Sequence, residues 1–160
     1  MTQRHEGETG HGGPPERDPA AVSRVASRAD LNSITLMQLA FSASQESNQE
    51  PFDSWVLGAK WGFAHEDKDG AGLLEVFFTL SITFDDESEV DPLTAVYRAR
   101  YTVDKPGELS KQDFDQFVHW NAAFNVWPYW RELVHTMTMR SDLRPVVAPL
   151  FKMPAGAEGG

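Results

Sequence analysis

The chain contains no cysteine, which excludes disulfide bonds, thiolate catalysis and zinc sites built on cysteine. It also lacks any apolar run near the roughly 18 residues that a membrane-spanning helix needs. The first stretch, MTQRHEGETGHGGPPERDP, has no apolar segment of the kind that signal peptides carry. We therefore expect a cytoplasmic protein that is neither exported nor inserted into a membrane.

Basic residues are scarce as well. Lysine and arginine total 14, against 24 aspartate and glutamate residues, so the formal net charge is −10. Nucleic-acid phosphates and anionic lipid headgroups both attract basic surface, and neither is an expected partner of such an acidic chain. Basic, neutral or apolar partners fit the composition better.

Motifs that indicate chemistry are absent: there is no phosphate-binding glycine loop, no G-x-S-x-G and no H-E-x-x-H. His65, His119 and His135 fall on different predicted elements and lack the spacing of metal ligands, so we interpret them as structural or solvated. Two acidic turns do not follow the calcium-loop pattern. We expect no enzyme, cofactor or metal, and a pair of catalytic carboxylates in a cleft is the alternative left open.

The length of 160 residues suits one domain with a sizeable core. Residues 1–18 are rich in glycine, proline, histidine and charge, and they bury too little apolar area to offset the entropy of ordering. We predict a disordered tail over 1–18, a single domain over 19–153 and a flexible tail over 154–160.

After the tail, a helical pattern gives way to alternating patterns. Pro19 precedes apolar residues at helical spacing, Val22 and Val25 among them, which predicts a short amphipathic helix. Short connections between four extended segments then predict an antiparallel sheet with one packed face. The first of these segments has no polar face, and this strand together with the helical layer described next is expected to carry the contacts between subunits. The segments span 34–44, 55–65, 74–84 and 93–103.

Beyond the last strand the pattern has the period of a helix. Ser110 and Asp113 have the spacing of a capping box. Pro128 inside one long helix would cost about 3 kcal/mol, so two helices are predicted, with Asn125 capping the second. The fold class is therefore α+β: a four-stranded antiparallel sheet followed by two helices packed on one face.

Aromatic side chains exceed what one core requires. Trp61 is expected in the core, but Phe52 and Trp55 lie in or beside a polar link, which indicates oligomerisation, peptide binding, or both. The alternative is a small-ligand-binding protein or enzyme with a cavity between sheet and helices. The residues predicted to line a peptide-binding groove are Phe52, Trp55, Trp127, Trp130, Val134 and Met137.

Three stretches in order resemble the SecB family of export chaperones: EPFDSW at 50–55, FNVWPYWREL at 124–133 and LRPVVAPLF at 143–151. The most specific is Pro-Tyr-x-Arg-Glu at 128–132, and the resemblance covers roughly 34–152. A helix that runs straight into the first strand is similar to the SecB-like chaperones of toxin–antitoxin systems.

The resemblance implies an ATP-independent holdase that assembles as a homotetramer, a dimer of dimers, and binds unfolded preproteins or an antitoxin. In the family, an acidic outer face of the sheet docks the SecA ATPase. The residues of this chain that offer a similar acidic field are Asp85, Asp86, Glu87, Glu89 and Asp91.

Overall fold

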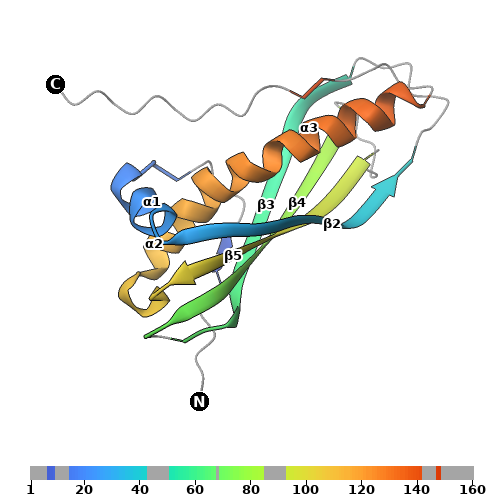
Figure 1. Ribbon diagram of the computed structural model, residues 1–160. Coiled ribbons are helices and arrows are strands. Elements are labelled where there is room, and N and C mark those ends of the chain that lie inside the picture. The colour runs from blue at the N-terminus through green and yellow to red at the C-terminus, as the bar shows by residue number, and fades with distance from the viewer. Residues whose placement is uncertain are drawn as a thin grey trace.

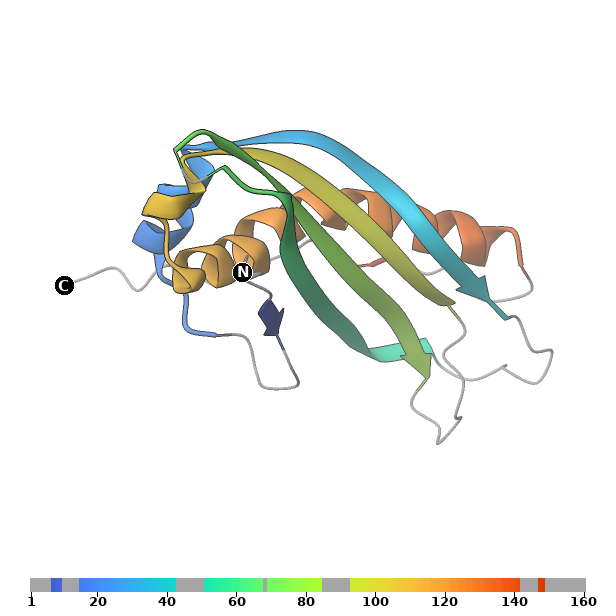
Figure 2. The same cartoon turned by 90° about the horizontal axis from the view of Figure 1, so that it is seen from below.

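The computed structural model describes residues 7–9, 15–42, 51–67, 69–84, 93–141 and 147–148, and for 7–9, 51–57 and 83–84 it describes the backbone alone. The described part forms two layers, with a twisted antiparallel sheet covered on one face by helices (Figures 1 and 2). None of the described helices combines the length and the hydropathy needed to cross a bilayer.

The sheet has five strands in the order β1-β3-β4-β5-β2. Their bounds are Gly7–Thr9 for β1, Ala29–Phe41 for β2, Pro51–His65 for β3, Ala71–Phe84 for β4 and Leu93–Asp104 for β5. The four long strands are those that the alternating patterns predict. β3, β4 and β5 form a meander, whereas β2 crosses over and pairs with β5, so β2 is an edge strand.

The packed face of the sheet follows the period of two. In β5, side chains alternate without a break between buried and half-buried positions. Directly paired residues of an antiparallel sheet point to the same face, so the buried set of β4 lies beside that of β5. This confirms the predicted core strands. The buried apolar residues are Leu74, Val76, Phe78, Leu80 and Ile82 in β4, and Leu93, Ala95, Tyr97, Ala99, Tyr101 and Val103 in β5.

The segment 1–18, in which the sequence predicts no element, contains the short strand β1, which pairs with residues 59–61 of β3. Asp18 then caps α1, Pro19–Ala26, because its Oδ1 accepts from the amides of Ala20 and Ala21. The residues just before α1 are also held by α2, Lys111–Phe117, since Gln116 donates to the carbonyl of Glu16 and accepts from the amide of Asp18.

The helical layer is continuous, and here the prediction of a break at Asn125 is wrong. A 3-10 turn, Pro106–Glu108, leads to α2, Lys111–Phe117, a π-helical segment, Val118–Ala122, and α3, Ala123–Met139. Ser110 does cap α2 in the predicted capping box with Asp113. Asn125, however, is no cap, and Pro128 lies inside α3.

Packing explains the difference. α3 crosses the sheet diagonally, while α1 and α2 gather at one end of the strands (Figures 1 and 2). The Asn125 side chain donates to the hydroxyl of Tyr101 at 3.1 Å, which ties α3 to β5. Burying one large apolar side chain contributes about 1.5 to 3 kcal/mol, so the several that α3 buries outweigh the cost of an internal proline. A π turn also adds a residue to the helix and adjusts which side chains face the core.

Candidate functional site

The predicted peptide-binding residues of α3 belong mostly to the core. Trp130 and Val134 are 0% exposed and Trp127 is 8% exposed. All three pack in the main apolar cluster between helix and sheet, and Met137, half-buried, packs against it. Their helical spacing was predicted correctly, but the face they form covers this chain's own sheet. We therefore assign Trp127, Trp130 and Val134 to the core and not to a binding groove.

The other predicted contacts lie outside the described side chains. Phe52 and Trp55 lie in β3, which begins at Pro51 and therefore includes the end of the predicted polar link. Their side chains are not among those described. The acidic turn also falls outside the described residues; it consists of Asp85, Asp86, Glu87, Glu89 and Asp91.

Exposed leucines gather on β2, which the sequence singles out as a strand without a polar face. Leu36 and Leu39 are each 41% exposed. They pair with Tyr97 and Ala95, whose side chains are buried beneath the helices, so these leucines point to the helix side of the sheet where no described residue fully covers them. The exposed apolar residues of β2 are Leu31, Leu36, Met37 and Leu39, and we call them the β2 surface.

A second apolar surface follows the outward side of α3. Phe124 is 48% exposed, Tyr129 49% and Met139 56%. On a helix with 3.6 residues per turn Met139 lies opposite the buried Trp130, while Phe124 and Tyr129 lie on the two flanks of the outward side. Glu132 and His135 are exposed between them. This outward face of α3 is thus apolar with interspersed polar groups, as helix surfaces that meet a partner often are.

The outer face of the sheet carries several charged side chains around Phe77. Phe77, 37% exposed, lies in one row with Lys60 of β3 and Arg98 of β5. Arg100, which pairs with Glu75, donates to its carboxylate at 2.8 Å, and Arg98 lies 3.7 Å from the same oxygen. Glu75 therefore faces two guanidinium groups beside Phe77, and Lys60 stands in register with Glu8 of β1. The described part of the outer face thus carries charges of both signs, unlike the acidic face expected by resemblance.

Perturbed titrating groups occur in the fold, but they do not converge on one site. Burial, assisted by Glu132, raises the pKa of Tyr97 to about 12. Burial also raises the pKa of Tyr101 to about 12, although the hydrogen bond from Asn125 opposes it. Burial lowers the pKa of His119. The tyrosines bond to helix α3, Tyr97 donating to the carbonyl of Tyr129 at 3.3 Å. The two tyrosines therefore fasten α3 to the sheet.

Neither a metal site nor a drug-sized pocket is found among the residues that the structure describes. Among the described residues, no three histidine, aspartate or glutamate side chains gather closely enough to hold an ion. One small pocket of about 140 Å³ lies at the end of the sheet near α2. That volume is below the roughly 300 Å³ at which pockets for drug-sized ligands begin. No local sequence pattern indicates this pocket, because its walls come from β3, the 3-10 turn and α2.

Comparison with known proteins bears on the fold. No family model and no curated protein matches the sequence. Among solved structures, the chain is similar to a SecB-like chaperone of Mycobacterium tuberculosis in complex with a ChAD peptide from the HigA1 antitoxin. The TM-score is 0.56 at 18% identity, over 83% of this chain and 94% of the other. A protein of unknown function from Streptococcus agalactiae matches with a TM-score of 0.50 at 14% identity, over 76% of this chain and 97% of the other.

The chain therefore has a SecB-like fold of the α+β class. Four long antiparallel strands followed by a helical region are what the family resemblance implies, and the match to the mycobacterial chaperone confirms it.

Proposed function

We propose that this chain is a SecB-like holdase of the cytoplasm, which binds non-native polypeptides without ATP and catalyses no reaction. The observation that carries the proposal is the β2 surface, an apolar strand exposed on a fold that is shared with a chaperone. Isolated exposed leucines are ordinary, but several on one uncovered edge strand mark a surface that binds other chains.

The β2 edge suits an extended chain in two ways. An unfolded client exposes apolar side chains, and burying each leucine of β2 with a client residue contributes about 25 cal/mol per Å² of apolar area. An edge strand also presents a row of backbone N–H and C=O groups that an extended segment can pair with. Backbone pairing is independent of sequence, as a holdase with many clients requires. Phe52, Trp55 and Met137 remain proposed side-chain contacts for the client.

Self-association competes for the same surfaces. We propose a homo-oligomer, in the family's arrangement a dimer of dimers, with contacts through the β2 surface and the outward face of α3. Both surfaces are apolar and neither is fully covered by described residues. If β2 forms the subunit interface, the client is expected to bind at the surface around Phe52 and Trp55 instead. The experiment below distinguishes a β2 surface that binds clients from one that binds another subunit.

For the client, an antitoxin segment is the favoured candidate over a preprotein. The mycobacterial protein of the same fold was solved with a peptide of an antitoxin. Docking of SecA is a further proposal and rests on the acidic turn 85–91 alone, because the described outer face around Phe77 carries charges of both signs. Neutralising Asp85, Asp86 and Glu87 is expected to abolish any salt-sensitive retention of SecA.

The test is suppression of aggregation. The purified full chain, without nucleotide, is mixed in excess with a chemically unfolded client and light scattering is followed. Suppression is expected for the wild type and reduced suppression for Leu36→Glu with Leu39→Glu. The matched control is Thr35→Glu with Gln38→Glu, which adds the same charge to the other face of β2. No suppression by folded wild-type protein would reject the proposal. Equal suppression by both double variants, with only the leucine variant losing self-association, would assign β2 to the subunit interface.

A further inference from the structure

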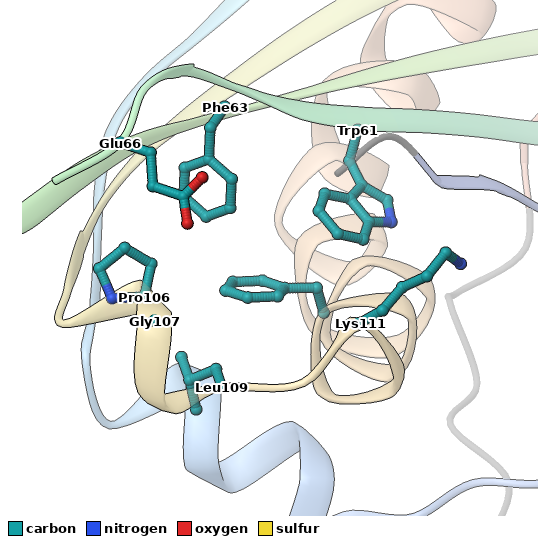
Figure 3. A pocket seen from close by; sticks show the side chains of 8 residues that line it. Trp61, Phe63, Glu66, Pro106, Gly107, Leu109 and Lys111 are labelled. Atoms are coloured by element: carbon teal, nitrogen blue, oxygen red, sulfur yellow. The ribbon is translucent and has the colours of Figure 1, made fainter. Parts of the chain in front are cut away.

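A small pocket lies at the end of the sheet where the 3-10 turn meets α2 (Figure 3). Its volume is about 140 Å³. A single amino-acid side chain fits such a volume, whereas a nucleotide does not. The lining residues are Trp61, Phe63, Glu66, Pro106, Gly107, Leu109, Lys111 and Phe114.

Three aromatic rings make up much of the wall. The ring centroid of Phe114 lies 5.2 Å from that of Trp61 and 5.3 Å from that of Phe63, and the Trp61 and Phe63 centroids are 6.4 Å apart. The indole of Trp61 donates to Asp115 at 2.8 Å, which fixes its orientation. Gly72 lets Phe63 and Pro106 pack closely against the backbone, because a Cβ at this position would come within 3.0 Å of the Phe63 ring and 3.1 Å of Pro106. The rings are therefore held in place before any ligand arrives.

Two charged side chains lie at opposite ends of the pocket, Glu66 beside Phe63 and Lys111 beside Trp61 (Figure 3). The Lys111 amine donates to Asp115 at 2.7 Å and is neutralised there. Glu66 has no hydrogen-bond or ion-pair partner among the described residues and is half-buried. The charge left uncompensated in the pocket is therefore negative, on a wall that is otherwise aromatic and apolar.

We propose that this pocket binds one lysine or arginine side chain of an extended peptide. The aliphatic stem packs on Pro106 and Leu109, the cation lies against the aromatic rings, and Glu66 receives its charge. A cation within about 6 Å of an aromatic centroid is attracted by the ring quadrupole, and more strongly where water is excluded. Lysine and arginine combine an aliphatic stem with a terminal cation, so one such side chain uses both the apolar wall and the carboxylate.

The pocket is separate from the β2 surface and from the outward face of α3, because none of its lining residues belongs to β2 or α3, and it lines β3 at Trp61 and Phe63 rather than at Phe52 and Trp55. It recognises a charge, whereas the β2 surface recognises apolar area. The inference therefore does not depend on chaperone activity.

The experiment follows the Trp61 indole N–H by NMR in the ¹⁵N-tryptophan-labelled full chain, with the signal assigned from Trp61→Phe. The probes are Ac-Gly-Gly-Lys-Gly-Gly-NH₂, its arginine analogue, and the norleucine analogue, which has a similar aliphatic stem without the charge. We expect both cationic peptides to shift the Trp61 signal and to bind roughly tenfold more tightly than the norleucine peptide. The signals of the other four tryptophans report whether each variant keeps the native fold.

Glu66→Gln keeps the size of the side chain and removes its charge, and we expect it to weaken lysine-peptide binding at least fivefold. Glu132→Gln removes the same charge from an exposed site of α3, a helix that contributes no residue to the pocket, and should have no effect. Equal binding of the lysine and norleucine peptides would show a purely apolar pocket and overturn the proposal. Absence of any shift at Trp61, or full binding by Glu66→Gln, would overturn it as well.

Discussion

Asp113 shows how one buried carboxylate joins two parts of the fold. Its Oδ2 accepts from the amide of Ser110, and its Oδ1 accepts from the Arg24 guanidinium at 2.6 Å and 3.0 Å. Burial alone would raise the pKa of Asp113, but the hydrogen bonds from Arg24 and Ser110 hold it below the ordinary value. The side chain thereby caps α2 and fixes α1 against it.

Asp113→Asn is expected to lower the free energy of unfolding by about 1 to 2 kcal/mol, since charge-assisted hydrogen bonds and part of a cap are lost while Arg24 stays solvated. A carboxylate whose pKa is lower in the folded state than in the unfolded state stabilises the fold at pH values above the unfolded pKa of about 4. This stabilisation is lost as the pH falls through the folded pKa. Urea titrations at pH 7 and pH 3 should show a large difference between the two proteins only at pH 7. Asp104→Asn, at an exposed site, is the control. An equal difference at both pH values would contradict the assignment.

Trp130 tests the division between core and binding surface. Trp130→Ala should lower the free energy of unfolding by about 3 to 5 kcal/mol, because a fully buried indole leaves a cavity. Glu132→Ala, at an exposed polar position of the same helix, should change it by less than about 0.5 kcal/mol. Thermal and urea denaturation measure both. Client binding lost in Trp130→Ala without a loss of stability would return Trp130 to a binding groove.

At the scale of elements, α3 tolerates a proline that local propensity disfavours. Pro128 lies well inside the helix, beyond the first turn in which its missing N–H would carry no cost. Because the residue is exposed, its ring contributes little packing in return.

Pro128→Ala should therefore raise the free energy of unfolding by about 1 to 3 kcal/mol, as the helix regains a donor and loses a clash. Chemical denaturation followed by tryptophan fluorescence gives the value. Glu132→Ala, an exposed change in the same helix, provides the baseline of about ±0.5 kcal/mol. A destabilised Pro128→Ala variant would mean that the proline shapes a contact which the isolated chain does not reveal.

Periodicity explains which elements the sequence predicts and which it misses. The residues of β4 and β5 alternate without interruption, so their strands and buried faces follow from the sequence. β1 consists of Gly-Glu-Thr, which has no strand pattern, and it forms by pairing with β3. The stripe of Trp130 and Val134 was predicted as a face, but a stripe does not specify which neighbour covers it. The pocket around Glu66 depends on contacts between distant segments, and local patterns carry no information on these.

At the scale of the whole molecule, the two exposed apolar surfaces predict association. Light scattering with size-exclusion chromatography should give a mass above that of one chain at micromolar concentration. Leu36→Glu with Leu39→Glu should shift the mass downward, because a charge buried at an apolar contact is costly. The variant with Thr35→Glu and Gln38→Glu should keep the wild-type mass. A wild type that remains monomeric would reject the oligomer.

The two edges of the sheet differ, and the difference bears on how copies pair. On one side β1 covers residues 59–61 of the long strand β3, and on the other side the sheet ends in β2, a strand of thirteen residues. β1 thus interrupts the outer edge of β3, whereas no described strand interrupts β2. Pairing of β2 with β2 is self-complementary: two copies related by a two-fold axis use up this edge of each and cover the leucines of both. A head-to-tail contact between β2 and the outer edge of β3 would instead meet β1. The strand that exposes leucines thus favours a closed pair over a fibre.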